Sequence, residues 1–180
     1  MTHANLLRGD RIQLNALTSD DIPTIARWYE DTEFLRMYDA RLVCPKSEAE
    51  LKKWLEALEK AENTVTLAVR LLDSGELIGY TELDGILWPH GVSGFSIAIG
   101  DRANWGKGYG YEAARLTLSF AFDELNLHRI TATIFSYNER SIALFEKLGF
   151  QYEGAFREFL QRDGKRHDML LYGLLRREWE

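Results

Sequence analysis

The segment Asn104-Trp-Gly-Lys-Gly-Tyr-Gly-Tyr-Glu-Ala113 is the most informative part of the chain, because three of its residues are alternating glycines. It lies between a strand predicted at Val92–Gly100 and a helix predicted at Tyr109–Leu125. Alternating glycines let the backbone turn tightly with its N–H groups facing inward, and the following helix adds the positive end of its dipole. Such a loop is a cradle for an anion and suits a pyrophosphate.

The glycine spacing separates this loop from two common phosphate-binding motifs. It is Gly-x-Gly-x-Gly, whereas a Rossmann loop has Gly-x-Gly-x-x-Gly after the first strand, and a P-loop ends in Gly-Lys-Ser/Thr. Here the glycines follow the fourth predicted strand. Taken alone, the motif is also compatible with a connection that merely turns the chain.

A second motif follows at Tyr137-Asn-Glu-Arg-Ser-Ile-Ala-Leu-Phe-Glu-Lys-Leu-Gly-Phe150. Asn138 is suited to cap a helix, Ser141 falls in its first turn, and Gly149 stands just past its end. Apolar residues repeat at helical spacing between them. Each of these residues therefore has a structural explanation when it is considered alone.

Periodicity over the whole chain predicts an α/β fold in a single domain, residues 1–180, without linkers or repeats. The short connections favour a mixed, mostly antiparallel sheet. We expect residues 31–46 to be irregular. The predicted strands, about seven, are Arg11–Leu17, Thr64–Leu72, Glu76–Trp88, Val92–Gly100, Arg129–Phe135, Tyr152–Gln161 and Arg166–Leu175. The predicted helices, about four, are Ile22–Tyr29, Ser47–Ala61, Tyr109–Leu125 and Asn138–Leu148.

Charge and composition exclude several classes of protein. The chain has 22 basic and 28 acidic residues and a net charge of −6, without a basic block, so it is unsuited to nucleic acid. Its apolar runs fall short of the ~20 residues that span a bilayer, so we expect no membrane segment.

Three features of the sequence indicate where the protein is located and whether it binds a metal. The start of the chain shows no basic segment leading into an apolar one, and Cys44 is the only cysteine. We therefore expect no signal peptide and a cytoplasmic location. The four histidines lack the spacing of metal ligands, so we expect no metal.

The two motifs together, in this strand order, resemble the GCN5-related N-acetyltransferases (GNAT), in particular the branch of ribosomal-protein alanine and spermidine N-acetyltransferases. The resemblance covers essentially the whole chain. In the family's pyrophosphate loop, Gln/Arg-x-x-Gly-x-Gly/Ala, Trp105 takes the first position, and Gly108 and Gly110 take the small ones. Asn138 and Ser141 match the Asn-x-x-Ser of the second motif. The resemblance implies a GNAT fold with a splayed strand pair for acetyl-CoA.

The resemblance also implies acetyl transfer from acetyl-CoA to a primary amine on a small molecule, a polyamine or a protein N-terminus. The splayed strand would bind the pantetheine arm through its free backbone groups, and the glycine loop would bind the pyrophosphate. The residues implied for this site are Phe95, Ile97, Ile99, Trp105, Gly106, Lys107, Gly108, Tyr109, Gly110, Asn138, Ser141 and Phe145.

The catalytic residues are less well defined, because Phe145 stands where many family members have a tyrosine that acts as the general acid. The resembled branch offers Ser141 as the general acid, although this serine is equally suited to contact only backbone or cofactor. The strand before the loop has no carboxylate, so Glu82 is the candidate base. Glu158 and a water chain are the alternatives.

Three further possibilities remain open at this point. The donor could be another acyl-CoA, such as succinyl-CoA, or the domain could bind acyl-CoA without catalysis. A homodimer is also left open. Residues 1–100 carry the whole net charge of the chain, and Asp31, Glu33 and Asp39 are expected to favour a cationic amine.

Overall fold

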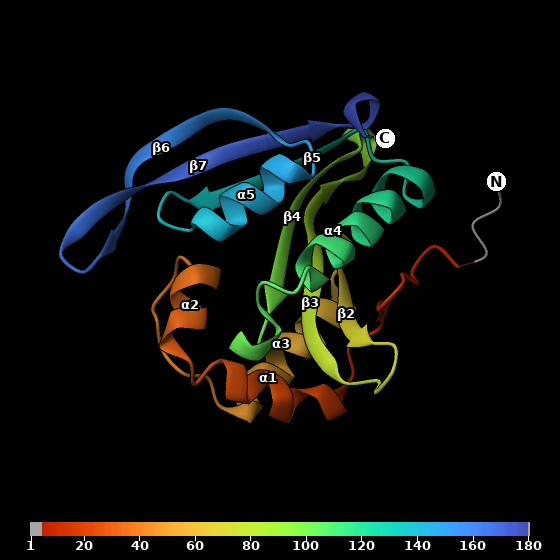
Figure 1. The fold of residues 1–180 in the computed structure, drawn as a ribbon, viewed down its shortest axis with the longest axis vertical. Coiled ribbons are helices and arrows are strands. Elements are labelled where there is room, and N and C mark those ends of the chain that lie inside the picture. Colours follow the sequence, from red (N-terminus) through yellow and green to blue (C-terminus); the bar gives the residue numbers. More distant parts are fainter. Residues whose placement is uncertain (1–4, 180) are drawn as a thin grey trace.

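The computed structural model describes residues 5–179, whose strands form one seven-stranded sheet in the order β1-β2-β3-β4-β5-β7-β6 (Figure 1). Neighbouring strands are antiparallel except for β4 and β5, which are parallel. This confirms the predicted mixed, mostly antiparallel sheet. The strands are β1 (Ile12–Asn15), β2 (Val65–Leu71), β3 (Leu77–Leu87), β4 (Val92–Ile99), β5 (Arg129–Phe135), β6 (Gln151–Arg162) and β7 (Lys165–Leu175).

Five α-helices accompany this sheet within residues 5–179, one more than the sequence predicts. They are α1 (Ile22–Trp28), α2 (Thr32–Tyr38), α3 (Glu48–Lys60), α4 (Tyr109–Ser119) and α5 (Glu139–Lys147). The long helix predicted to reach Leu125 changes to a π-helical turn at Phe120–Glu124, where the Leu125 N–H donates to the Phe120 carbonyl. None of these helices has the length and apolar character needed to cross a membrane.

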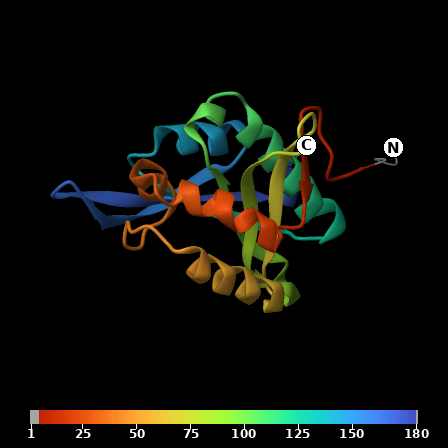
Figure 2. The ribbon, with the colours of Figure 1, turned by 90° about the horizontal axis from the view of Figure 1, so that it is seen from below.

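The helices cover both faces of the sheet. Helices α4 and α5 lie on one face and α3 lies on the other, which is clearest in Figure 2. The largest core cluster fills the space under α4 and α5, and a second cluster joins α1, α2 and α3 to strands β2 to β4. On β4, Phe95 and Ile97 therefore face α4 and α5, while Ala98 faces the other helices.

Helix α2 corrects the expectation that residues 31–46 are irregular. Asp31 caps it by accepting hydrogen bonds from the N–H groups of Glu33 (2.9 Å) and Phe34 (3.4 Å). Phe34 and Leu35 are buried in the second core cluster. This helix of 7 residues is stabilised mainly by packing, because an isolated segment so short is not helical in water.

Strands β4 and β5 separate after a short paired stretch. Their parallel pairing covers only Val92–Gly94 with Arg129–Thr131. Beyond this point, Phe95–Ile99 pairs with β3 alone, at Leu83–Gly79. On the side of β4 that faces β5, the backbone groups have no strand partner, and such groups need another partner when they are shielded from water. The expected splay is thus present and opens beside the glycine loop.

Candidate functional site

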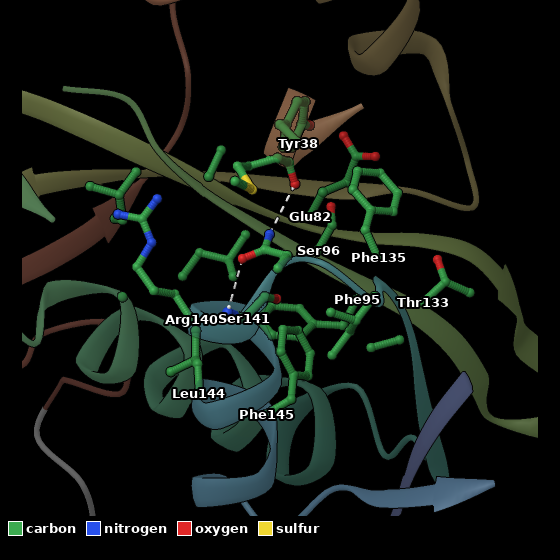
Figure 3. Close-up of a pocket in the computed structure, with 18 of the residues that line it drawn as sticks. Tyr38, Glu82, Phe95, Ser96, Thr133, Phe135, Arg140, Ser141, Leu144 and Phe145 are labelled. Atoms are coloured by element: carbon green, nitrogen blue, oxygen red, sulfur yellow. Dashed lines mark hydrogen bonds between the residues drawn. The ribbon is translucent and has the colours of Figure 1, made fainter. Parts of the chain in front are cut away.

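A cavity of about 780 Å³ occupies the space between the splayed strands. Strands β3, β4 and β5, the glycine loop, α2 and the start of α5 all contribute to its wall (Figure 3). This volume lies within the range of ~300–1,000 Å³ that is usual for small-molecule sites. The cavity therefore joins the two sequence motifs into a single candidate site.

The glycine loop forms one end of this cavity. Gly106 and Gly108 have φ angles of +72° and +85°, and Gly108 is the N-cap of α4. Both angles lie in the left-handed region that glycine adopts at no steric cost. Gly106, Gly108 and Gly110 all line the cavity, as expected for the anion cradle.

Two residues expected at the loop site do not line the cavity, namely Lys107 and Tyr109. Lys107 is exposed, and its carbonyl accepts a hydrogen bond from Arg11. The ring of Tyr109 lies under the Arg11 guanidinium, 4.9 Å from ring centroid to Cζ. Both of these residues thus contact Arg11.

Trp105 fastens the loop to the end of β4. Its indole N–H donates to the Ile99 carbonyl at 2.7 Å. The guanidinium of Arg140, whose Cζ lies 4.1 Å from the ring centroid, stacks on the indole, and Arg102 lies at 5.9 Å. Trp105 is thus a structural element of the loop, and Arg140, which the sequence analysis did not identify, joins it in the cavity wall.

The second motif places Asn138 and Ser141 on the opposite wall. Asn138 caps α5, because its Oδ1 accepts from the Ser141 N–H at 3.2 Å, and its Nδ2 donates to the Met37 carbonyl at 3.2 Å (Figure 3). Within residues 5–179 the Ser141 hydroxyl has no hydrogen-bond partner, although it lines the cavity. An asparagine amide carries a second hydrogen as well. Both groups are therefore suited to contact a ligand.

Two phenylalanines close the narrow end of the splay. Phe95 and Phe145 are buried, with ring centroids 5.7 Å apart, and Phe150 packs against Phe145 at 4.9 Å. This floor is apolar, and Phe145 has no proton to donate.

The carboxylates that line the cavity are Glu82 and Asp84 of β3. Glu82 lies opposite Ser96 in the sheet register and accepts a hydrogen bond from the Thr66 hydroxyl at 3.2 Å. Burial raises the pKa of Glu82, and the nearby charge of Asp84 raises it further. A carboxylate with a raised pKa accepts a proton more readily, which is the property that a general base needs.

Glu158, the alternative base, lies outside the cavity wall. It occupies an irregular stretch of β6 between Phe156 and Leu160, with a φ of +54° and an exposed side chain. Its backbone N–H donates to Asp168 Oδ1 at 2.8 Å. Glu158 is therefore less well placed than Glu82, which does line the cavity.

Tyr38 on α2 also lines the cavity, and the sequence analysis missed it (Figure 3). Burial raises the pKa of Tyr38 far above its ordinary value, so its phenol stays protonated at neutral pH. The signal was present in the sequence: Phe34 and Tyr38 are four residues apart and follow the cap Asp31.

The acidic residues near α2 do not present free charge to the cavity, contrary to expectation. Arg102 pairs with Asp31 and with Glu33, each at 2.6 Å, and Arg41 pairs with Asp39 at 3.1 Å. The hydrogen bond from Arg102 lowers the pKa of Asp31 to about 2. These three carboxylates are thus paired with arginine side chains, and none of them lines the cavity.

Potential metal ligands are scattered over the described chain. Within residues 5–179, no group of three or more His, Cys, Asp or Glu side chains is placed to hold a metal ion.

Comparison with known families identifies a match over most of the chain. A family profile described as an acetyltransferase (GNAT) domain matches residues 11–151. A SPbeta prophage-derived uncharacterized N-acetyltransferase of Bacillus subtilis, YokL, is 30% identical over 172 residues, which are 96% of this chain and 94% of that protein. The putative ribosomal N-acetyltransferase YdaF of the same organism is 43% identical over 75 residues, 42% of this chain and 41% of that protein.

Solved structures show the same fold. The spermidine N-acetyltransferase of Vibrio cholerae, in complex with CoA and spermine, superimposes with a TM-score of 0.84 at 24% identity. The superposition covers 93% of this chain and 96% of that chain. At this level of identity the likeness concerns the fold.

Proposed function

The chain belongs to the GNAT family of acetyl-CoA-dependent N-acetyltransferases, and on that premise we propose that the opening between β4 and β5 binds acetyl-CoA and presents it to a primary amine. The observation that carries this proposal is the splay itself. The backbone groups of Phe95–Ile99 that face β5 have no strand partner, and the glycine loop lies at the open end of the same strand.

The residues around the opening fit acetyl-CoA in their chemistry. The free edge of β4 is suited to an extended arm that carries amide groups, as the pantetheine arm does. Gly106, Gly108 and the start of α4 offer backbone N–H groups and a helix dipole to the pyrophosphate. Asn138 and Ser141 face the arm from α5.

The transfer needs a neutral amine, a polarised carbonyl and a proton for the leaving sulfur. Acetyl-CoA supplies the activated acetyl group. In our proposal the ammonium group first loses one proton to solvent, and Glu82 takes the second proton, which the nitrogen releases as its new bond to carbon forms. Ser141 donates a proton to the sulfur as the carbon–sulfur bond breaks. Solvent then returns a proton to the serine oxygen and takes the proton from Glu82. Glu82 has the raised pKa that suits the first role, and the Ser141 hydroxyl has no partner in the described chain to compete for the second.

The acceptor enters from the α2 side of the sheet in this proposal. Glu82 and Asp84 lie on that face, where their charge attracts an ammonium group before it loses its proton. Relatives support more than one kind of acceptor, since one structural neighbour is a spermidine N-acetyltransferase and one relative is a putative ribosomal N-acetyltransferase. We therefore propose a primary amine on a small molecule, a polyamine or a protein N-terminus.

Ser141→Ala is expected to lower turnover about a hundredfold, the lower end of the range of ~10²–10⁴ that general acids contribute. The affinity for acetyl-CoA should stay within about twofold, because the variant keeps the backbone N–H of residue 141, which donates a hydrogen bond to Asn138 Oδ1. Steady-state kinetics and calorimetry measure the two effects. Unchanged turnover would remove Ser141 from the acid role.

Thiol release from a panel of acyl-CoA donors and amines tests the function as a whole. We expect acetyl-CoA to be the best donor, because Phe95 and Phe145 close the narrow end of the cavity. Faster turnover of succinyl-CoA would identify a different acyltransferase. Tight acetyl-CoA binding with no turnover of any amine would identify a binding domain without catalysis.

A further inference from the structure

Arg11 contacts the glycine loop from a distant part of the sequence. It directly precedes β1, and its Nη1 donates to the carbonyl of Lys107 at 2.8 Å. Its backbone N–H and its Nε donate to the two carboxylate oxygens of Glu112, at 2.8 and 3.1 Å. One arginine thus holds both the loop and the first turn of α4.

Glu112 is fixed tightly by these contacts. Its side chain is only 15% exposed, and it also accepts from the Ile12 N–H at 3.3 Å. Gly9 allows this close approach, because a Cβ there would lie 2.4 Å from Glu112 Oε1. A carboxylate in the first turn stabilises the helix dipole, but it also opposes a second anion at the same helix end.

The hydrogen bond to Lys107 sets the direction of the next N–H group. The Lys107 carbonyl and the Gly108 N–H belong to one trans peptide, so they point in opposite directions. With the carbonyl turned to Arg11, the Gly108 N–H points away from Arg11, and Gly108 lines the cavity. Within residues 5–179 this N–H has no acceptor.

We propose that Arg11 is a positioning residue for the pyrophosphate of acetyl-CoA. It turns the Gly108 N–H toward the phosphates and offsets the charge of Glu112 beside them. This inference rests on the proposed function, because it takes the loop to be the pyrophosphate site. It adds to that function a residue that lies outside both sequence motifs and outside the cavity wall.

Arg11→Met tests the proposal, since methionine keeps an apolar stem and removes both the donors and the charge. We expect the Kd for acetyl-CoA to rise at least about tenfold, the effect of losing one charge-assisted hydrogen bond. Turnover of acetyl-pantetheine, which lacks the pyrophosphate, should stay within about twofold of wild type. The selectivity for acetyl-CoA over acetyl-pantetheine is therefore the quantity that falls.

Arg8→Met is the matched control. Arg8 is exposed on the same segment, and its side chain makes no hydrogen bond to the loop. The Arg8→Met variant loses the same charge as Arg11→Met, so a general effect of net charge would weaken acetyl-CoA binding equally in both variants. We expect the Arg8 variant to bind as wild type does.

Three results would overturn the inference: an unchanged Kd in the Arg11 variant, an equal loss with both donors, or an equal effect of Arg8→Met. Wild-type protein that does not bind acetyl-CoA would overturn the proposed function as well. Gly9→Ala keeps the test decisive if the Arg11 variant does not fold. Its methyl group displaces Glu112 without removing a charge, and it should weaken acetyl-CoA binding several-fold while sparing acetyl-pantetheine.

Discussion

Gly108→Asp is expected to abolish measurable binding of acetyl-CoA. Gly108 has a φ of +85° and is the N-cap of α4, so an aspartate there would add a negative charge at the helix end that is proposed to hold the pyrophosphate. Two like charges ~4 Å apart repel by about 4 kcal/mol at an effective dielectric constant near 20, which corresponds to roughly a thousandfold in Kd. The added Cβ would also lie 3.1 Å from Arg11 Nη2.

Gly75→Asp is the control for backbone strain in this experiment. Gly75 has a φ of +73°, and a Cβ there would meet no heavy atom within 4 Å. Both variants therefore place an aspartate at a residue with a left-handed φ, but only Gly108→Asp places it at the cradle. Calorimetry should show wild-type affinity for the Gly75 variant and no binding for the Gly108 variant. Wild-type affinity in the Gly108 variant would exclude the loop as the pyrophosphate site.

Glu82→Gln is expected to lower turnover about a hundredfold or more, within the range of ~10²–10⁴ that a general base contributes. Glutamine has nearly the same shape and can still accept the hydrogen bond from Thr66, but it cannot take the proton of the amine. Binding of acetyl-CoA should be unchanged, because Glu82 lies on the acceptor side of the sheet. Steady-state kinetics with a saturating donor measure the loss.

The pH profile gives this variant a second signature. The pKa of Glu82 is raised above its ordinary value of 4.5, and the carboxyl group works as a base only when it is deprotonated. The kcat/KM of the wild type should therefore rise as the pH increases through the Glu82 pKa, and this limb should be missing in the Gln variant. Asp84→Asn removes the charge that helps to raise the pKa, so it should move the limb to lower pH. Wild-type turnover with an unchanged limb in Glu82→Gln would exclude Glu82 as the base.

The local part of the site could be predicted from the sequence. The glycine loop, the cap Asn138 and the end of α5 at Gly149 each depend on residues a few positions apart, and short-range backbone preferences determine such features. The splay was anticipated through family resemblance, and the pairing of β4 with β5 as far as Gly94 bears it out.

The features that the sequence analysis missed depend on contacts between distant residues. Helix α2 is short, and it is held by Phe34 and Leu35 in the core and by the Tyr137 hydroxyl, which donates to the Arg36 carbonyl at 2.7 Å. The contact between Arg11 and the loop joins residues that lie 96 positions apart. No local pattern encodes such a pairing, because it arises only when β1 and α4 pack together.

The sequence also could not show which carboxylates near the site carry a free charge. The acidic residues Asp31, Glu33 and Asp39 suggested an attractive surface for a cationic amine, yet each is paired with an arginine in the folded chain. Composition gives the number of charges, but only the fold shows which of them are neutralised. The free carboxylates of the cavity, Glu82 and Asp84, lie instead on β3.

A crystal structure of the protein with coenzyme A bound is the most direct test of the proposed site. We predict a pantetheine arm hydrogen-bonded along Phe95–Ile99, between β4 and β5, with the pyrophosphate on the N–H groups of residues 106–110. Coenzyme A bound elsewhere, with the splay between β4 and β5 empty, would contradict the proposal.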